Sequence, residues 1–102
     1  MENSELRSKY CLSPHMDFEW HDVKNAENFR KHGIDFSWAI RVFDDPNVFE
    51  YDDDDPEEDR VNAIGLIESR LIHVTYTMRD DVCRIISARG AERHERRRYH
   101  ES

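Results

Sequence analysis

The strongest constraint on the fold comes from three closely spaced segments, in each of which apolar and polar side chains alternate: residues 60–67, 71–79 and 82–89. Such alternation is typical of half-buried strands. The connections between the segments, Glu68-Ser69-Arg70 and Asp80-Asp81, have the length of hairpin loops. The sequence therefore predicts an antiparallel meander, and a short strand is also expected at Val48–Tyr51 before it.

The alternation also predicts which side chains share a face of this meander. If Asp80-Asp81 is a two-residue turn, one face carries Ile72, Val74, Tyr76, Met78, Cys83 and Ile85. The other face carries His73, Thr75, Thr77 and Arg84, together with Ile86 and Ala88. We expect the first face to be core and the second to be polar. A loop longer by one residue would exchange the faces of one strand.

Two helical segments are expected before the meander, preceded by a strand at Met16–Trp20. The first begins at Asp22 as N-cap and ends at Gly33. Its apolar side carries Val23, Ala26 and Phe29, and its opposite side carries Lys24, Asn28, Lys31 and His32. The second segment has Asp35 as N-cap and a core-facing stripe of Phe36, Ala39, Ile40 and Phe43.

The two ends of the chain differ in character. Residues 1–15 are polar and aperiodic and are expected to form a tail, which leaves residues 16–102 as a single domain. Residues 91–99 are expected to form a closing helix, although only Ala91 and Tyr99 are apolar or aromatic there. Such a helix needs side-chain pairs or a partner surface. The expected fold class is α+β.

The net charge of −8 is unevenly distributed along the chain. Residues 44–59 contain ten acidic and no basic side chains, and the remainder has 15 basic against 13 acidic ones. Residues 84–98 carry six arginines against two glutamates. This asymmetry is typical of proteins that bind nucleic acids or charged proteins, although a solvated loop and a solvated helix would also explain it. Without an apolar run of about 20 residues or a signal peptide, a cytoplasmic location with no membrane contact is expected.

No strong catalytic motif is present. The sequence has no phosphate-binding glycine loop, no His-Glu-x-x-His helix, no paired-cysteine metal knuckle and no glycine-flanked serine, which argues against most nucleotide-, metal- and serine-dependent enzymes. Arginine suits phosphate because its planar guanidinium donates two parallel hydrogen bonds and keeps its charge. His32 and His73 are candidate acid/base groups, or surface and packing residues. Arg60 is a candidate phosphate ligand or an ion-pair partner of the acidic segment.

Several short motifs, in this order and spacing, resemble the BrnT toxins of type II toxin-antitoxin systems: Phe18-Glu19-Trp20, Lys31-His32-Gly33, Phe43-Asp44-Asp45-Pro46, Ile64-Gly65, Ile85-Ile86-Ser87-Ala88-Arg89 and Glu95-Arg96-Arg97-Arg98-Tyr99. The resemblance implies a RelE-like α+β fold, with two N-terminal helices packed on a small antiparallel sheet and a closing C-terminal helix. It also implies a ribonuclease that inhibits translation and is neutralised by a BrnA-type antitoxin. Operator DNA would be bound only through the antitoxin complex, in which the toxin could form a homodimer.

The resemblance also implies roles for particular residues. The catalytic set would be Lys24, His32, Arg60 and Arg84, and the RNA-binding set Arg89, Glu95 and Arg97. The implied chemistry uses neither a metal nor another cofactor, because the 2′-hydroxyl of the RNA attacks the adjacent phosphate. The alternative function is a non-catalytic interaction module that acts only as the partner of a DNA-binding protein.

Overall fold

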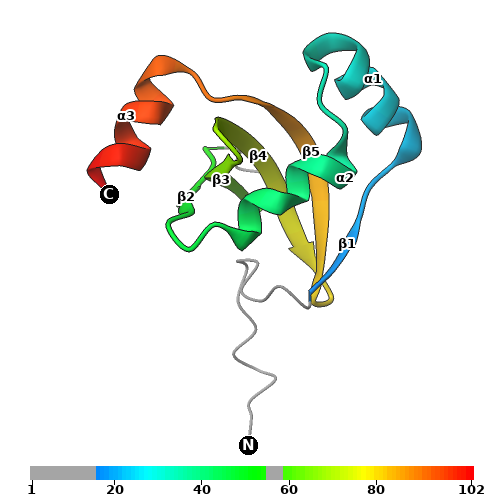
Figure 1. The fold of residues 1–102 in the computed structure, drawn as a ribbon. Helices are drawn as coiled ribbons and strands as arrows, with labels where there is room; N and C mark the ends of the chain where they lie inside the picture. The colour runs from blue at the N-terminus through cyan, green and yellow to red at the C-terminus, as the bar shows by residue number, and fades with distance from the viewer. Residues whose placement is uncertain (1–15, 55–58) are drawn as a thin grey trace, which may run out of the picture.

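The computed structural model describes residues 16–54 and 59–102, and the expected tail at residues 1–15 lies outside them. In chain order the elements are β1 (Asp17–Glu19), α1 (Asp22–His32), α2 (Phe36–Ala39), the 3₁₀ helix η2 (Ile40–Asp44), β2 (Phe49–Asp52), β3 (Arg60–Ile67), β4 (Arg70–Arg79), β5 (Val82–Gly90) and α3 (Arg93–Glu101). In Figure 1, α2 crosses in front of the sheet, α1 lies beside β5 and α3 lies at the opposite side. The α+β class is confirmed. None of the described helices has the length and apolar character needed to span a membrane.

The sheet has five strands in the order β1-β5-β4-β3-β2. Strands β2 to β5 pair antiparallel in chain order, as the sequence predicts. The expectation of a wholly antiparallel sheet is wrong at one edge, because β1 pairs with β5 in parallel. Parallel neighbours need a long crossover connection, and here the chain passes through the helices and three strands before it returns as β5.

The core lies between one face of the sheet and the α2–η2 segment. Phe36, Ala39 and Val42 from this segment are fully buried against the predicted apolar face of β4 and β5. Asp35 caps α2 as predicted, but the helix changes to 3₁₀ geometry at Ile40. The segment packs so closely on β3 that a Cβ atom added to Gly65 would lie 2.7 Å from Val42 Cβ. Only glycine fits at this contact.

A bulge in β5 changes the predicted faces of the last hairpin. Arg79 pairs with Val82, so Asp80-Asp81 is the expected two-residue turn, with positive φ at both residues. The register shifts between Thr75 and Tyr76, which leaves Ile86 as an extra residue on β5. As a result Ala88 is fully buried on the core face, and its predicted place on the polar face is wrong.

The side of helix α1 that is buried is not the apolar side that the sequence predicts. Val23 and Phe29, expected to face the core, are 57% and 54% exposed, and Ala26 is exposed as well. The buried residue is Asn28, whose Nδ2 donates to the carbonyl oxygens of Ala88 (2.8 Å) and Ile34 (3.0 Å).

This arrangement follows from the edge of β5. Asn28 Oδ1 also accepts from the backbone N–H of Ala88 at 3.1 Å. Because β1 ends at Glu19, the later part of β5 has no strand neighbour on this side. The Asn28 amide therefore satisfies the backbone groups that a neighbouring strand would satisfy. The expected N-cap is one residue off, since His21, not Asp22, caps α1.

Helix α3 is held by polar contacts, as its weak apolar stripe requires. Glu92 and Glu95 form a capping box at its start. Near its end the Tyr99 hydroxyl donates to Asp45 Oδ2 at 2.6 Å, and the same oxygen accepts from the Leu66 N–H at 2.8 Å. Burial and this hydrogen bond raise the pKa of Tyr99 to about 12. Asp45 thus joins the end of η2, strand β3 and helix α3.

Candidate functional site

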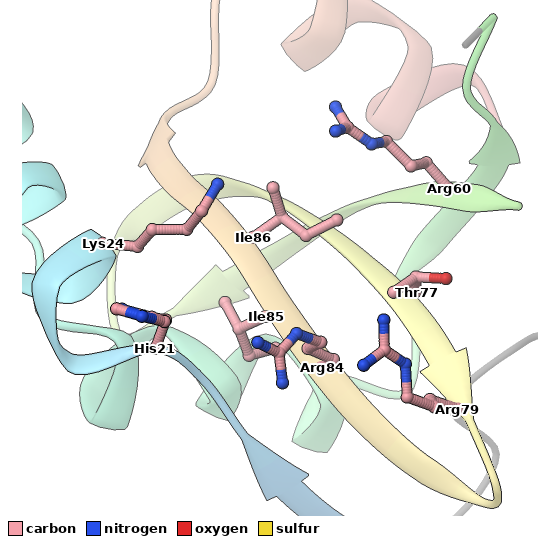
Figure 2. A pocket seen from close by; sticks show the side chains of 8 residues that line it. All are labelled: His21, Lys24, Arg60, Thr77, Arg79, Arg84, Ile85 and Ile86. Atoms are coloured by element: carbon pink, nitrogen blue, oxygen red, sulfur yellow. The ribbon is translucent and has the colours of Figure 1, made fainter. Parts of the chain in front are cut away.

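A cavity of about 180 Å³ on the polar face of the sheet gathers basic side chains from four elements. This basic cavity is lined by His21, Lys24, Arg60, Thr77, Arg79, Arg84, Ile85 and Ile86. In Figure 2, His21 and Lys24 enter from the α1 side and Arg60 from β3, with Arg84 and Arg79 on β5 and β4. Three of the predicted catalytic residues, Lys24, Arg60 and Arg84, therefore line one cavity. Converging cations of this kind attract an anion.

Arg84 is oriented by a carboxylate on the edge strand. Its Nη1 donates to Glu19 Oε2 at 2.9 Å, and the two residues face each other across the parallel β1–β5 pair. Both side chains are partly exposed, so a ligand can reach the guanidinium. A guanidinium has five N–H donors, which leaves several for a second anion. Glu19 therefore positions Arg84 without using all of its hydrogen-bonding capacity.

His21 lines the basic cavity and also caps α1. Its Nδ1 accepts from the backbone N–H of Val23 at 3.2 Å, as the cap of α1. In a neutral imidazole with an accepting Nδ1, the proton resides on Nε2. The lone pair that a general base needs is thus occupied, and Nε2–H remains available to an anion.

Four residues of this site are not among those that the sequence predicts. They are Glu19, which positions Arg84, and the lining residues His21, Thr77 and Arg79. Thr77 and Arg79 follow from the alternation of β4, which places them on the face of His73. His21 follows from a correct assignment of the N-cap. No local signal identifies Glu19, because its partner Arg84 is brought to it only by the parallel pairing of β1 with β5.

His32 lies in a neighbouring cavity and not in the basic cavity. This α1 cavity, of about 190 Å³, is lined by Lys24, Glu27, Asn28, Lys31, His32, Ile86 and Ser87. It shares Lys24 and Ile86 with the basic cavity. Of the four predicted catalytic residues, His32 is thus the one set apart from Arg60 and Arg84, with Lys24 between them.

A third cavity adjoins both of these and is the largest of the three, at about 400 Å³. This polar cavity is lined by Tyr51, Asp53, Arg60, Asn62, His73, Thr75, Ser87, Arg89 and Glu95. It shares Arg60 with the basic cavity and Ser87 with the α1 cavity. The three cavities therefore neighbour one another on the polar face of the sheet, and α1 and α3 contribute residues to their walls.

Two of the predicted RNA-binding residues, Arg89 and Glu95, pair with each other in the wall of the polar cavity. Arg89 donates two hydrogen bonds to Glu95, at 2.9 and 2.8 Å. Burial acts to raise the pKa of Glu95, but the bonds from Arg89 and from the Glu92 N–H outweigh it and lower the pKa to about 2. The same pairing raises the pKa of Arg89. Glu95 is therefore ionised at neutral pH and balances the charge of Arg89.

The two remaining predicted residues, His73 and Arg97, lie in different surroundings. The side chain of His73 is buried, with Nε2 3.6 Å from Glu95 Oε2. Burial lowers the pKa of His73, so the imidazole is neutral at neutral pH. Arg97 is exposed on α3, and none of the three cavities includes it.

One group of residues in the described part of the chain could approach a cation. Glu92, His94 and Glu95 bring one ligand atom each within 4.8 Å of one another. Both oxygens of Glu95 already accept hydrogen bonds from Arg89. We therefore assign no metal to this group.

The family described as the ribonuclease toxin, BrnT, of type II toxin-antitoxin systems matches residues 20–95. The matched span contains every residue that lines the basic cavity. No curated protein matches the chain.

Proposed function

The chain belongs to the BrnT family, the ribonuclease toxins of type II toxin-antitoxin systems, and from this membership we propose that the basic cavity binds the scissile phosphate of its RNA substrate. The observation that carries this proposal is the convergence of Lys24, Arg60, Arg79 and Arg84 on one small cavity. A phosphodiester offers two unesterified oxygens, which match the paired donors of a guanidinium.

The proposed reaction needs no metal. The RNA 2′-hydroxyl attacks the adjacent phosphorus, the bond to the 5′-oxygen breaks, and a 2′,3′-cyclic phosphate and a 5′-hydroxyl result. Negative charge builds on the phosphoryl oxygens in the transition state. Arg84, oriented by Glu19, and Arg60 stabilise this charge. Removing one such donor raises a barrier by about 3 kcal/mol in other enzymes.

Proton transfer is assigned to the side of the cavity formed by α1. The attack releases the proton of the 2′-hydroxyl, and the leaving 5′-oxygen takes one up. Lys24 lines the cavity directly and, as an ammonium group that can only donate, is the first candidate to protonate the leaving 5′-oxygen. His32, in the adjoining α1 cavity, is the candidate to accept the proton of the 2′-hydroxyl. His21 donates from Nε2 to a phosphoryl oxygen, since its Nδ1 is engaged. Arg97 and its neighbours on α3 are assigned to flanking phosphates.

We also propose a fold family, a domain extent and partners for the chain. We assign residues 16–102 to one RelE-like domain, with α1 and α2 before the sheet and α3 closing it. The family has an antitoxin partner and an RNA target. We expect the antitoxin to be of the BrnA type, operator DNA to be bound only through the complex, the toxin to pair with a second copy within that complex, and the protein to act in the cytoplasm.

The proposal is tested by RNA cleavage in the presence of EDTA. The full chain should cleave single-stranded RNA, and Arg84→Ala should reduce the rate by roughly 10²- to 10³-fold. Arg84→Lys keeps the charge but loses the paired donors, so its rate should lie between the two. The matched control is Arg30→Ala, an exposed arginine of α1 that lines none of the three cavities.

Two results would contradict the proposal. Intact RNA with folded wild-type chain would favour the non-catalytic module, particularly if the protein still formed a stable complex with the product of a neighbouring gene. Equal losses for Arg84→Ala and Arg30→Ala would show that general charge, and not the basic cavity, accounts for the activity.

A further inference from the structure

We propose that the polar cavity binds one nucleobase of the RNA, beside the phosphate in the basic cavity, and that Asp53 selects guanine there. This inference rests on the proposed function and adds a substrate preference to it. The nucleotide would place its phosphate and its base on the two sides of Arg60, which lines both cavities.

The size and position of the polar cavity suit a base. Its volume of about 400 Å³ is many times the roughly 10–15 Å³ that one water needs on the same measure, so the cavity has room for a group as large as a base. Single-stranded RNA is read by proteins through unstacked bases held against aromatic or guanidinium planes. Tyr51 lines the cavity, and the Arg98 guanidinium lies 4.2 Å from the centre of its ring.

A chain of hydrogen bonds fixes which groups in the cavity donate and which accept. Asn62 Nδ2 donates to Asp53 Oδ1 at 3.0 Å, and Thr75 Oγ1 donates to Asn62 Oδ1 at 2.8 Å. An ionised carboxylate can only accept, so the amide nitrogen of Asn62 must face Asp53. Asp53 is thereby held in place with acceptor capacity left over, because a carboxylate has about four lone-pair positions.

This arrangement favours a base with two adjacent donors. The Watson–Crick edge of guanine presents N1–H and the N2 amino group side by side, which matches the two oxygens of a carboxylate. Uracil presents a single N–H between two carbonyl oxygens, and these would repel Asp53. Adenine and cytosine present an amino group next to an acceptor nitrogen. A well-placed pair of hydrogen bonds discriminates between bases by about tenfold or more.

The charges of the cavity favour a neutral base over a second phosphate. The charges of Arg89 and Glu95 balance each other, and burial lowers the pKa of His73 so that it is neutral. The remaining charged lining groups are Arg60, which is shared with the basic cavity, and Asp53. A phosphate in this cavity would meet the carboxylate of Asp53, whereas the donor edge of a base would be stabilised by it.

The first experiment reads the base preference from cleavage. RNA with a randomised single-stranded segment is cut by the full chain, and the ends of the products are sequenced. Guanine should be enriched about tenfold over uracil at one position next to the cut. Asp53→Asn keeps the acceptor for Asn62 but replaces one carboxylate oxygen by an amide, so this preference should be lost. Asp54→Asn, an exposed neighbour outside the cavity, should keep it.

Cleavage without a base preference, or a preference that survives in Asp53→Asn, would overturn the inference while leaving the proposed function intact. Thermal unfolding of both variants checks that they are folded.

A second experiment does not depend on catalysis. Titration of the full chain with 3′-GMP and 3′-UMP, followed by NMR, should show tighter binding of 3′-GMP by about tenfold, with shifts at Asp53, Asn62 and Thr75. Asp53→Asn should make the two affinities equal. If the wild-type chain cleaves no RNA, the proposed function fails, and this titration still decides whether the polar cavity recognises guanine. Equal affinities in the wild-type chain would refute the recognition.

Discussion

The two faces of the sheet are formed by the same strands, yet they are built in opposite ways. The face under α2 and η2 is filled by apolar side chains such as Phe36, Val74 and Ile85, which are almost completely buried. The other face carries Asn62, His73 and Thr75, which are nearly as buried but polar. The first face stabilises the fold by removing apolar surface from water, whereas the second needs a partner for every polar group.

This difference implies that the apolar face mainly stabilises the fold and that the polar face carries the groups that bind ligands. The polar face is lined by cavities that a ligand can enter, and the apolar face is sealed by Gly65 packing directly on Val42. Substitutions on the apolar face should therefore act on the free energy of unfolding. Substitutions among the exposed groups of the polar face should act on RNA cleavage with little change in that energy.

The largest expected effect on stability is at Phe36. Phe36→Ala removes a fully buried ring from the apolar face and should lower the free energy of unfolding by about 3–5 kcal/mol. Arg79→Ala, an exposed lining residue of the basic cavity, is the matched variant on the polar face and should change it by less than about 0.5 kcal/mol. Urea unfolding measures both. Equal losses of unfolding free energy would contradict this assignment, because they would mean that the two faces contribute alike to stability.

A pH-dependent effect is expected at Glu95, the most strongly shifted carboxyl of the polar face. Its pKa is about 2 in the folded chain, below its ordinary value of 4.5, so its ionised form stabilises the fold above about pH 4.5. This contribution, at most about 3 kcal/mol, is lost as the pH falls from 4.5 toward 2.

Glu95→Gln should therefore destabilise the chain at pH 7 and lose most of that difference near pH 2.5, as measured by urea unfolding at each pH. Glu101→Gln, at the exposed end of α3, is the control and should show no such trend. A penalty for Glu95→Gln that is the same at every pH would contradict the assignment.

Gly65 tests how tightly the apolar face is sealed. In Gly65→Ala the new Cβ would lie 2.7 Å from Val42 Cβ and 2.8 Å from its carbonyl oxygen, so backbone must move. A loss of about 1–3 kcal/mol in unfolding free energy is expected. Gly90→Ala, where a Cβ would meet nothing within 4 Å, is the matched control. If both variants melt at the same temperature, the close approach of η2 to β3 is not needed.

The sequence predicts the positions of the strands better than it predicts which side of a helix is buried. β3 was predicted at its observed bounds, since alternation and turn chemistry are local properties. The faces of α1 and the position of Ala88 were wrong because both depend on the bulge and the open edge of β5, which arise from strand pairing. For the site, the family resemblance implies Lys24, His32, Arg60 and Arg84 as one set, and all but His32 line the basic cavity. The Glu19 contact and the Arg89–Glu95 pairing require the tertiary structure.

The smallest expected effect is at Phe29, and it tests which side of α1 packs against the sheet. Phe29 is about half exposed, so Phe29→Ser should change the free energy of unfolding by only about 0.5 kcal/mol. Asn28→Ala, on the neighbouring residue, should cost about 1–3 kcal/mol, because it leaves the N–H and C=O of Ala88 without their buried partner. This order reverses what hydrophobicity predicts for an amphipathic helix. A larger loss for Phe29→Ser than for Asn28→Ala, measured by urea unfolding, would mean that the apolar side of α1 is the one that packs.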